Sequence, residues 1–317
     1  IGWCDWSSDV CSSDLNGLWS VPVSLGSTVN SSYLDGWVCL SNDGLELYFG
    51  SNRPGGRGGV DLWVTTRSTT SDSWRAPANL GSTINTVNRD NTPWITPDGL
   101  ELYFTSDRPG GYGAGDIWMA RRTSTSDEWG EPVNLGPVVN CAAGDWHPCL
   151  SADGLVLFFS DYDNTDMMLH PGGYGRSDMY MTRRKSLIDP WEPPTNLGLG
   201  VNTRAWDCQP RVSADGSVLY FTSSRPETGL LTQRSDVWQT PIIPIVDLNG
   251  DGSAEIEDLL ILIENWGTVE PRCDVGPMPW GDGLVDAADL EVLMSYWRQE
   301  AFDPTLIAHW RLDEGQG

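Results

Sequence analysis

The chain of 317 residues carries 44 acidic and 19 basic side chains, which gives a formal net charge of −25 at pH 7. Such a field repels phosphate backbones, so nucleic acid is excluded as an expected partner, whereas dispersed carboxylates favour cations. The hydrophobic fraction of 39% can build cores, and the length has room for about two domains. No apolar run reaches the roughly 18 residues of a transmembrane helix, so we expect no transmembrane segment.

The N-terminal segment needs separate treatment. Residues 5–15 read DWSSDVCSSDL and resemble the translation of a sequencing-library adapter. We therefore exclude residues 1–15 from fold reasoning. The natural N-terminus, with any signal peptide, is then expected to be missing, and we expect the chain to be an internal fragment. The seven cysteines form no C-x-x-C pair, which argues against a zinc ribbon or a redox motif.

Residues 16–242 contain one motif four times. Each copy opens on a tryptophan, in WSVPVSLGSTVN at 19, WRAPANLGSTIN at 74, WGEPVNLGPVVN at 129 and WEPPTNLGLGVN at 191. Two hydrophobic segments around a D-G pair follow and predict a hairpin. A Gly-rich turn then leads to a third strand, and the tryptophan segment of the next copy supplies a fourth. Four short strands at a fixed period predict the blade of a β-propeller.

The full repeat, for example TPDGLELYFTSDRPGGYGAGDIW at 96–118, resembles the repeats of TolB-like and WD-repeat-like β-propellers. The resemblance implies a mainly β fold with four recognisable blades. It implies no single function, because propellers of this kind serve many tasks. The strand expected at 18–26 either completes the fourth unit or belongs to a lost upstream blade.

A column of carboxylates precedes the inner strand of every unit. Its members are Asp35, Asp90, Asp145 and Asp207. The residues two positions later differ between units, and they include Trp37 and His147. Repeated aspartates beside variable residues are typical of a ligand-binding site at the mouth of the central channel, which makes these six residues a candidate ligand site. The alternative is that each aspartate only hydrogen-bonds its own turn.

A second column of carboxylates precedes the third strand, and arginines follow the second strand. The columns are Asp61, Asp116, Asp178 and Asp236, and Arg53, Arg108 and Arg225. We predict that these two columns pair within each blade. The third unit is longer, with a step of 62 residues in place of 55. Its extra segment carries Asp161, Asp163 and Asp166 at a spacing that fits no cation loop, so we interpret it as a solvated insertion.

The sequence DLNGDGSAEIED at 247–258 has the spacing of an EF-hand loop. Oxygen-bearing residues stand at positions 1, 3, 5, 7, 9 and 12: Asp247, Asn249, Asp251, Ser253, Glu255 and Asp258. Position 6 is a glycine that permits the sharp turn, position 7 would contribute its backbone carbonyl, and position 12 opens a helix. The spacing predicts a calcium site, with Asp in place of the usual Glu at position 12.

A second half repeats this pattern, because GDGLVDAADLEVLMSYW at 281–297 aligns with GDGSAEIEDLLILIENW at 250–266. Its matching ligand positions are Asp282, Leu284 (through its carbonyl), Asp286 and Asp289. Met278 and Trp280 at positions 1 and 3 cannot ligate, so Asp274 is a candidate to reach back from a lengthened loop. This half is either a second calcium site or a structural relic.

Together the two halves, residues 246–298, resemble a type I dockerin. The resemblance implies a small α-helical module that calcium stabilises. Two apolar stripes are expected to pack together, Leu259, Leu262, Ile263 and Trp266 against Leu290, Leu293, Met294 and Trp297. It also implies a cohesin-like partner, although the Ser/Thr pair of the family is replaced by Ile256–Glu257 and Ala287–Ala288. Residues 305–317 resemble the start of a LamG-like, concanavalin-type domain.

These features favour a secreted, non-catalytic binding and display protein, extracellular or at the cell surface, with calcium as its cofactor. Its expected role is in polysaccharide breakdown, with a cohesin-like module or a surface glycan as partner. One alternative is a hydrolase of O-glycosyl bonds, whose site lies in the propeller mouth or in a missing domain. Another is a structural cell-surface protein. The sequence contains no nucleophile elbow, H-E-x-x-H motif or phosphate loop.

Overall fold

The D-G pair of each repeat forms the tight turn of a hairpin. In the first repeat, Ser41 Oγ donates to Asp43 Oδ1 at 2.6 Å, and Gly44 adopts a φ of 70°. The matching Gly99 and Gly154 have φ values of 70° and 73°, a region that glycine enters without steric cost. The hairpins predicted from the D-G pairs are therefore confirmed.

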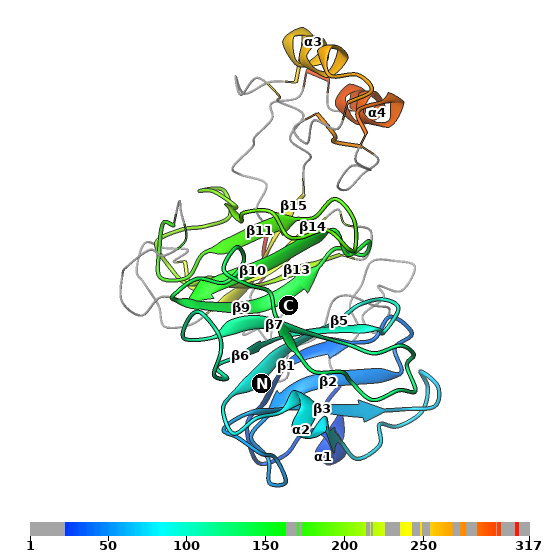
Figure 1. Ribbon diagram of the computed structural model, residues 1–317, viewed down its shortest axis with the longest axis vertical. Helices are drawn as coiled ribbons and strands as arrows, with labels where there is room; N and C mark the ends of the chain where they lie inside the picture. Colours follow the sequence, from blue (N-terminus) through cyan, green and yellow to red (C-terminus); the bar gives the residue numbers. More distant parts are fainter. Residues whose placement is uncertain are drawn as a thin grey trace. The chain divides into compact units, whose positions relative to one another are not determined.

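The computed structural model builds these hairpins into four antiparallel sheets of four strands each (Figure 1). We number the sheets as blades one to four in chain order. Their strands are β1 Asp35–Leu40, β2 Glu46–Ser51, β3 Asp61–Thr66 and β4 Ala78–Asn79; β5 Asp90–Ile95, β6 Glu101–Ser106, β7 Asp116–Arg121 and β8 Val133–Asn134; β9 Gly144–Leu150, β10 Val156–Tyr162, β11 Met179–Arg183 and β12 Thr195–Asn196; β13 Asp207–Val212, β14 Val218–Ser223, β15 Asp236–Pro241 and β16 Ala308–Trp310. The mainly β fold and its four-blade propeller arrangement are confirmed.

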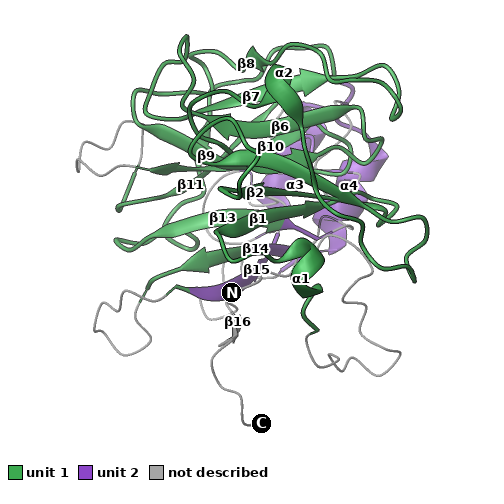
Figure 2. Cartoon of the chain, turned by 90° about the horizontal axis from the view of Figure 1, so that it is seen from below, with its two compact units in different colours: residues 1–211, 221–235 green, residues 212–220, 236–317 purple. Residues whose placement is uncertain are grey.

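Some parts of the chain fall outside the structural description. The structure describes residues 23–162, 170, 173–213, 216, 218–225, 235–242, 248, 254–268, 273–276, 284–295 and 297–298, and the backbone of 308–310. Two compact units divide the chain, residues 1–211 with 221–235 and residues 212–220 with 236–317 (Figure 2). The 5–15 segment and half of the loop 247–258, namely residues 247 and 249–253, lie outside the described residues.

The strand expected at 18–26 is not seen to complete blade four. Residues 18–22 lie outside the described residues, residues 23–25 form no strand, and Gly26 begins a four-residue helix, α1 Gly26–Val29. The outer position is taken instead by β16, in which Trp310 pairs with Val237 of β15. A second four-residue helix, α2 Gly81–Ile84, stands at the matching place before blade two.

The sheets are buried on both faces, as blades covered by neighbours must be. Every residue of β5 is buried, and Tyr48, Phe49, Tyr103 and Phe104 are at most 1% exposed. Successive blades are linked by single parallel bridges, Val60 to Arg89, Gly115 to Gly144 and Ser177 to Trp206. The same packing therefore recurs at each blade boundary, which explains why the same residues recur in the sequence.

Two longer helices lie in the second unit, α3 Ile256–Glu264 and α4 Ala287–Ser295. Their core contains Leu262, Val292 and Leu293, with Cys273 and Val275 from the intervening segment. Five of the eight predicted stripe residues lie in or against this core, but the prediction is wrong for three: Ile263, Trp266 and Met294 are 53%, 46% and 49% exposed. Residues outside the two helices, Ala254, Cys273, Val275 and Val285, complete the core.

Candidate functional site

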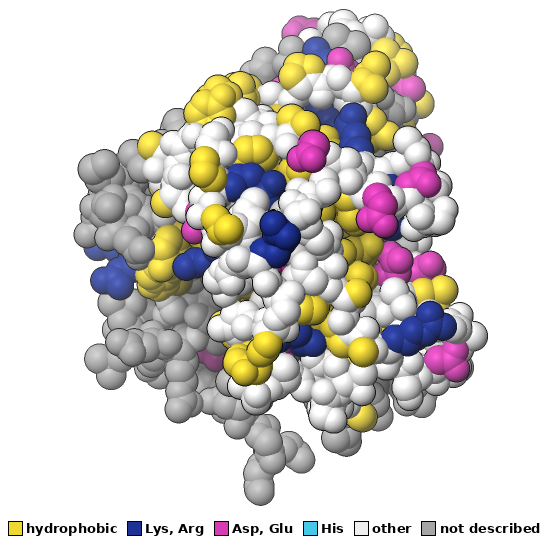
Figure 3. All heavy atoms as spheres, turned by 60° about the horizontal axis from the view of Figure 1, so that its bottom comes forward, with side chains coloured by type: hydrophobic (Ala, Val, Ile, Leu, Met, Phe, Trp, Pro, Cys, Tyr) yellow, Lys and Arg dark blue, Asp and Glu magenta, His cyan; other side chains and the backbone are white. Residues whose placement is uncertain are grey.

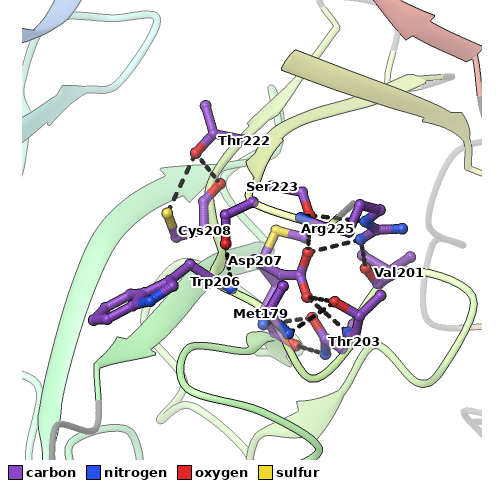
Figure 4. Close-up of polar contacts among 12 residues, drawn as sticks. Met179, Val201, Thr203, Trp206, Asp207, Cys208, Thr222, Ser223 and Arg225 are labelled. Atoms are coloured by element: carbon purple, nitrogen blue, oxygen red, sulfur yellow. Dashed lines mark hydrogen bonds and ion pairs between the residues drawn. The ribbon is translucent and has the colours of Figure 1, made fainter. Parts of the chain in front are cut away.

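The aspartate at the start of each inner strand anchors a small polar network. In blade four, Asp207 Oδ2 accepts the amide and the hydroxyl of Thr203 at 2.6 and 2.7 Å. Its Oδ1 accepts Ser223 Oγ and Arg225 Nη2, the latter at 2.7 Å. Figure 4 shows these contacts converging on one carboxylate, with Arg225 also donating to the carbonyl of Val201. We call this arrangement the Asp-Ser-Arg network.

Blades one and two contain the same network. Asp90, fully buried, accepts Thr86, Ser106 and Arg108, the guanidinium at 2.7 Å. In blade one the carboxylate of Asp35 accepts Ser31, Ser51 and Arg53. The aspartates thus hold their own turns, and they also fix the second strand. A ligand-binding role for this column stays a prediction.

In blade one the network also lowers the pKa of its carboxylate. Burial alone would raise the pKa of Asp35, but hydrogen bonds from Ser51, Arg53 and Ser31 outweigh it, and the pKa lies below its ordinary value. The guanidinium of Arg53 also lies 4.8 Å from the centre of the Phe49 ring. Charge pairing and ring contact together stabilise an ionised carboxylate inside the blade.

The predicted pairing between the second aspartate column and the arginines is wrong. The arginines Arg53, Arg108 and Arg225 pair with the first column. Asp61 instead accepts backbone amides of the Gly-rich turn, including Gly58 at 3.1 Å. Asp116 and Asp178 accept amides at the same place in their own blades. Backbone amides of the turn thus take the place of a guanidinium at these carboxylates.

The variable column has an unusual backbone. Trp37, Thr92, His147 and Gln209 have φ values of 53°, 51°, 59° and 59°. In blades one and two the inner strand has a register shift at this position. A bulge with a non-glycine residue at positive φ is rare and costly, and such residues collect at functional sites. We call these four residues the bulge residues.

The side chain of each bulge residue meets one position of the neighbouring second strand. Thr92 Oγ1 donates to Thr105 Oγ1 at 2.8 Å, and His147 Nδ1 lies 2.8 Å from Ser160 Oγ. In blade one this position is Gly50, where a Cβ would lie 3.0 Å from the Trp37 ring. In blade one the largest of these side chains therefore faces a glycine, whereas Thr92 and His147 face a threonine and a serine.

Residues beyond the bulges connect different blades. The guanidinium of Arg211 in β13 lies 5.2 Å from the centre of the Trp94 ring in β5. It also donates to the carbonyl of Pro148 in β9 at 3.4 Å. Burial and the Arg211 charge lower the pKa of His147 to about 3. His147 is therefore a neutral imidazole near neutral pH.

Blade three departs from the Asp-Ser-Arg network. Asp145 Oδ1 lies 2.6 Å from His170 Nε2, and its Oδ2 accepts the amide of Cys141 at 2.7 Å. Burial raises the pKa of the thiol of Cys141 and of the Asp145 carboxyl. Asp161 is 5% exposed, and burial raises its pKa to about 7. The interpretation of Asp161 as part of a solvated insertion is wrong; Asp163 and Asp166 lie outside the described residues.

The described part of the predicted calcium module shows two matching carboxylates. Asp258 is fully buried and accepts the amides of Leu248 and Glu255 at 2.7 and 2.8 Å. Asp289, also fully buried, accepts the amides of Val275 and Asp286 at 2.5 and 2.7 Å.

This correspondence sets Val275 beside Leu248, so Asp274 aligns with Asp247 at loop position 1. Glu255 caps α3, Asp286 Oδ1 accepts the amide of Ala288, and Leu284 is 42% exposed. Asp247, Asn249, Asp251, Ser253 and Asp282 lie outside the described residues. Calcium binding by either half stays a prediction.

Sequence reasoning missed two features of the site. The positive φ of the bulge residues has no sequence signal, because none of the four is glycine or asparagine. His170 lies in the lengthened segment of the third unit. Its signal was indirect: the arginine of the network is absent after β10, and Cys141 stands where the other units have Ser31, Thr86 and Thr203.

Comparison with known proteins gives structural similarity alone. No protein-family model matches the chain, and no curated protein matches it. TolB from Agrobacterium tumefaciens is 20% identical with a TM-score of 0.43, over 67% of this chain and 60% of that one. TolB from Acinetobacter baumannii is 14% identical with a TM-score of 0.44, and the match covers 68% of this chain and 43% of that one. A GH43 endo-arabinanase from Bacillus licheniformis is 16% identical with a TM-score of 0.44, and the match covers 70% of this chain and 78% of that one.

The chain thus spans less than two thirds of either TolB structure. At this level of similarity, function has to be argued from the residues of the chain itself.

Proposed function

We propose that this chain is a secreted, non-catalytic binding protein that attaches a carbohydrate-binding propeller to an extracellular partner through a calcium-dependent module. The bulge residues carry the proposal. Positive φ costs an L-residue about 1–3 kcal/mol, and glycine would remove that cost. Because glycine would remove this cost and none of the four positions is a glycine, we infer that the four side chains serve a function.

The chemistry of the bulge residues favours an uncharged, hydroxyl-rich ligand. Trp37, His147 and Gln209 are partly exposed, whereas Thr92 is 1% exposed and supports the frame. An indole face packs on the apolar face of a sugar, while an amide and a neutral imidazole exchange hydrogen bonds with its hydroxyls. None of the four carries a formal charge near neutral pH, so a neutral glycan is the expected class.

Hydrolysis of O-glycosyl bonds is the second candidate, and it requires two carboxylates that reach the scissile bond. Asp35, Asp90 and Asp207 are held by arginines. Asp145 and Asp161 have the raised pKa of a general acid, but they are 0% and 5% exposed. Among the described carboxylates of these columns, burial and pairing favour binding over catalysis.

The attachment role rests on the EF-hand spacing at 247–258 and on an exposed apolar surface. Leu260, Ile263 and Trp266 on or beside α3 are 53%, 53% and 46% exposed. Exposed apolar groups of this kind are typical of protein interfaces.

No helix among the described residues is long and apolar enough to cross a membrane. On the described residues of the face in Figure 3, acidic and basic side chains are interspersed, without a continuous basic strip.

Titration calorimetry against neutral and acidic polysaccharides tests the proposal. We expect a neutral polysaccharide to bind and Trp37→Ala to weaken binding up to about tenfold, the value of one aromatic contact. Trp37→Phe should retain most of the affinity. Tyr112→Ala removes another aromatic side chain, 51% exposed in a Gly-rich turn, and serves as the control. A panel without any binding would favour the structural surface protein instead.

A further inference from the structure

Blades one, two and four contain the Asp-Ser-Arg network, so the partners of their aspartates can be compared with those of Asp145 in blade three. In blades one, two and four, a hydroxyl of Ser31, Thr86 or Thr203 donates to the aspartate from four residues upstream. A serine of the second strand and an arginine complete the set. All donors are hydroxyl, amide or guanidinium groups, none of which binds metal ions well.

Blade three changes every side-chain partner of its aspartate. Cys141 replaces the upstream hydroxyl, Asp161 replaces the second-strand serine, and the position of the arginine is Asp163 in the sequence. His170 from the lengthened segment takes the place of the guanidinium beside Asp145. Thiol, carboxylate and imidazole are all metal ligands, so each replacement exchanges a group that binds metal ions poorly for one that binds them well.

The ligand atoms already lie close together. His170 Nε2 is 2.6 Å and Cys141 Sγ is 3.8 Å from Asp145 Oδ1, and the three atoms lie within 4.8 Å of one another. Ligands bound to one zinc ion at about 2.0–2.3 Å in tetrahedral geometry stand roughly 3.3–3.8 Å apart. Shifts below about 1 Å would place the three groups around one ion. The amide of Cys141 holds the other oxygen of Asp145 and orients the carboxylate.

The buried charge supports a cation at this place. Asp145 and Asp161 are 0% and 5% exposed, and buried carboxylates require compensating charge. The three other blades supply a permanent guanidinium, whereas His170 is charged only when protonated. A divalent ion restores the positive charge that blade three has lost with the arginine.

We propose that Cys141, Asp145 and His170 form a zinc site within blade three. A thiolate, an imidazole and a carboxylate together select zinc over calcium or magnesium, which prefer oxygen ligands alone. Three protein ligands leave the fourth tetrahedral position for water. The Cys141 thiol loses its proton to solvent as the sulfur–zinc bond forms. The site uses none of the residues of the calcium module and none of the bulge residues.

Cobalt substitution and metal analysis of the full chain test this site. The protein is kept in excess calcium, so that oxygen-only sites are filled, and is then given cobalt or zinc. We expect about one equivalent bound in the wild type, with the ultraviolet charge-transfer band of a thiolate–cobalt bond. Cys141→Ser should abolish the band and weaken zinc binding by more than about 100-fold, because loss of a supporting partner alone costs 10- to 100-fold.

The test separates loss of a ligand from loss of the fold. Serine stands at this position in blade one as Ser31, so Cys141→Ser is expected to fold with an unchanged circular dichroism spectrum. Cys208→Ser removes another partly buried thiol and should leave the band intact. The absence of a thiolate–cobalt band in the wild type would overturn the proposal, as would equal zinc binding by the wild type and Cys141→Ser. His170 would then act only as an ion-pair partner of Asp145.

Discussion

Removal of Asp90 is the sharpest perturbation of the propeller. Its carboxylate is fully buried and accepts four hydrogen bonds, from the amide and hydroxyl of Thr86, from Ser106 and from Arg108. Asp90→Ala removes the acceptor of Thr86 and Ser106. It also leaves the guanidinium of Arg108, only 10% exposed, with the carbonyl of Ile84 but without its counter-charge. Breaking a buried ion pair in this way costs about 3–5 kcal/mol.

The same blade offers a matched control. Arg121 pairs with Glu101 at 2.8 Å, but the arginine side chain is 54% exposed. Exposed pairs contribute about 0–1 kcal/mol, so Arg121→Ala should change the free energy of unfolding by less than about 1 kcal/mol. Both variants remove one member of an ion pair, and the difference between them reports the burial of the Asp90 pair together with the three further hydrogen bonds that Asp90 accepts.

Urea denaturation followed by tryptophan fluorescence in calcium-containing buffer measures both changes. We expect Asp90→Ala to shift the propeller transition far more than Arg121→Ala. The double variant Asp90→Ala with Arg108→Met should recover part of the loss, because it also removes the stranded charge. Equal, small effects of the two single substitutions would refute the idea that this network holds the blade together.

Three further predictions follow from other parts of the structure. Asp35 has a pKa below its ordinary value, so its contribution is present above the unfolded-state pKa of about 3.9 and is lost as pH falls through the folded-state value; stability should fall in that acid range, and less so in Asp35→Asn. Gly58→Ala should destabilise by about 1–3 kcal/mol, because a Cβ there would lie 2.0 Å from Asn88 O, while Gly59→Ala, with nothing within 4 Å, should not; thermal melts of the pair decide this. Chelation of calcium should lower the calorimetric transition of residues 246–298 and leave the propeller transition in place, and an identical trace with and without chelator would contradict the calcium module.

The strands and hairpins were predictable because their signals are local. A D-G pair between hydrophobic segments specifies its turn through Asp43 and Gly44 alone. Repetition then identified the propeller, since a blade that packs only on other blades must repeat its inward residues.

The partners of the arginines were not predictable, because two aspartate columns were equally available in the sequence. The choice depends on the approach of Arg53 to Asp35, 18 residues apart in the chain, and on the backbone amides that already satisfy Asp61. Likewise, residue type gave no warning that Trp37 and Thr92 adopt positive φ. His170 was hidden because the lengthened segment of the third unit breaks the alignment that identified every other column.

The most direct test of the central claim measures the fate of a bound polysaccharide. A polysaccharide that binds in calorimetry is incubated with the full chain in calcium-containing buffer, and its reducing ends and chain length are followed over time. The account predicts that the polymer binds, that Trp37→Ala weakens this binding, and that the polymer is recovered unchanged. A steady release of reducing ends by the purified wild type would contradict it and identify a glycoside hydrolase.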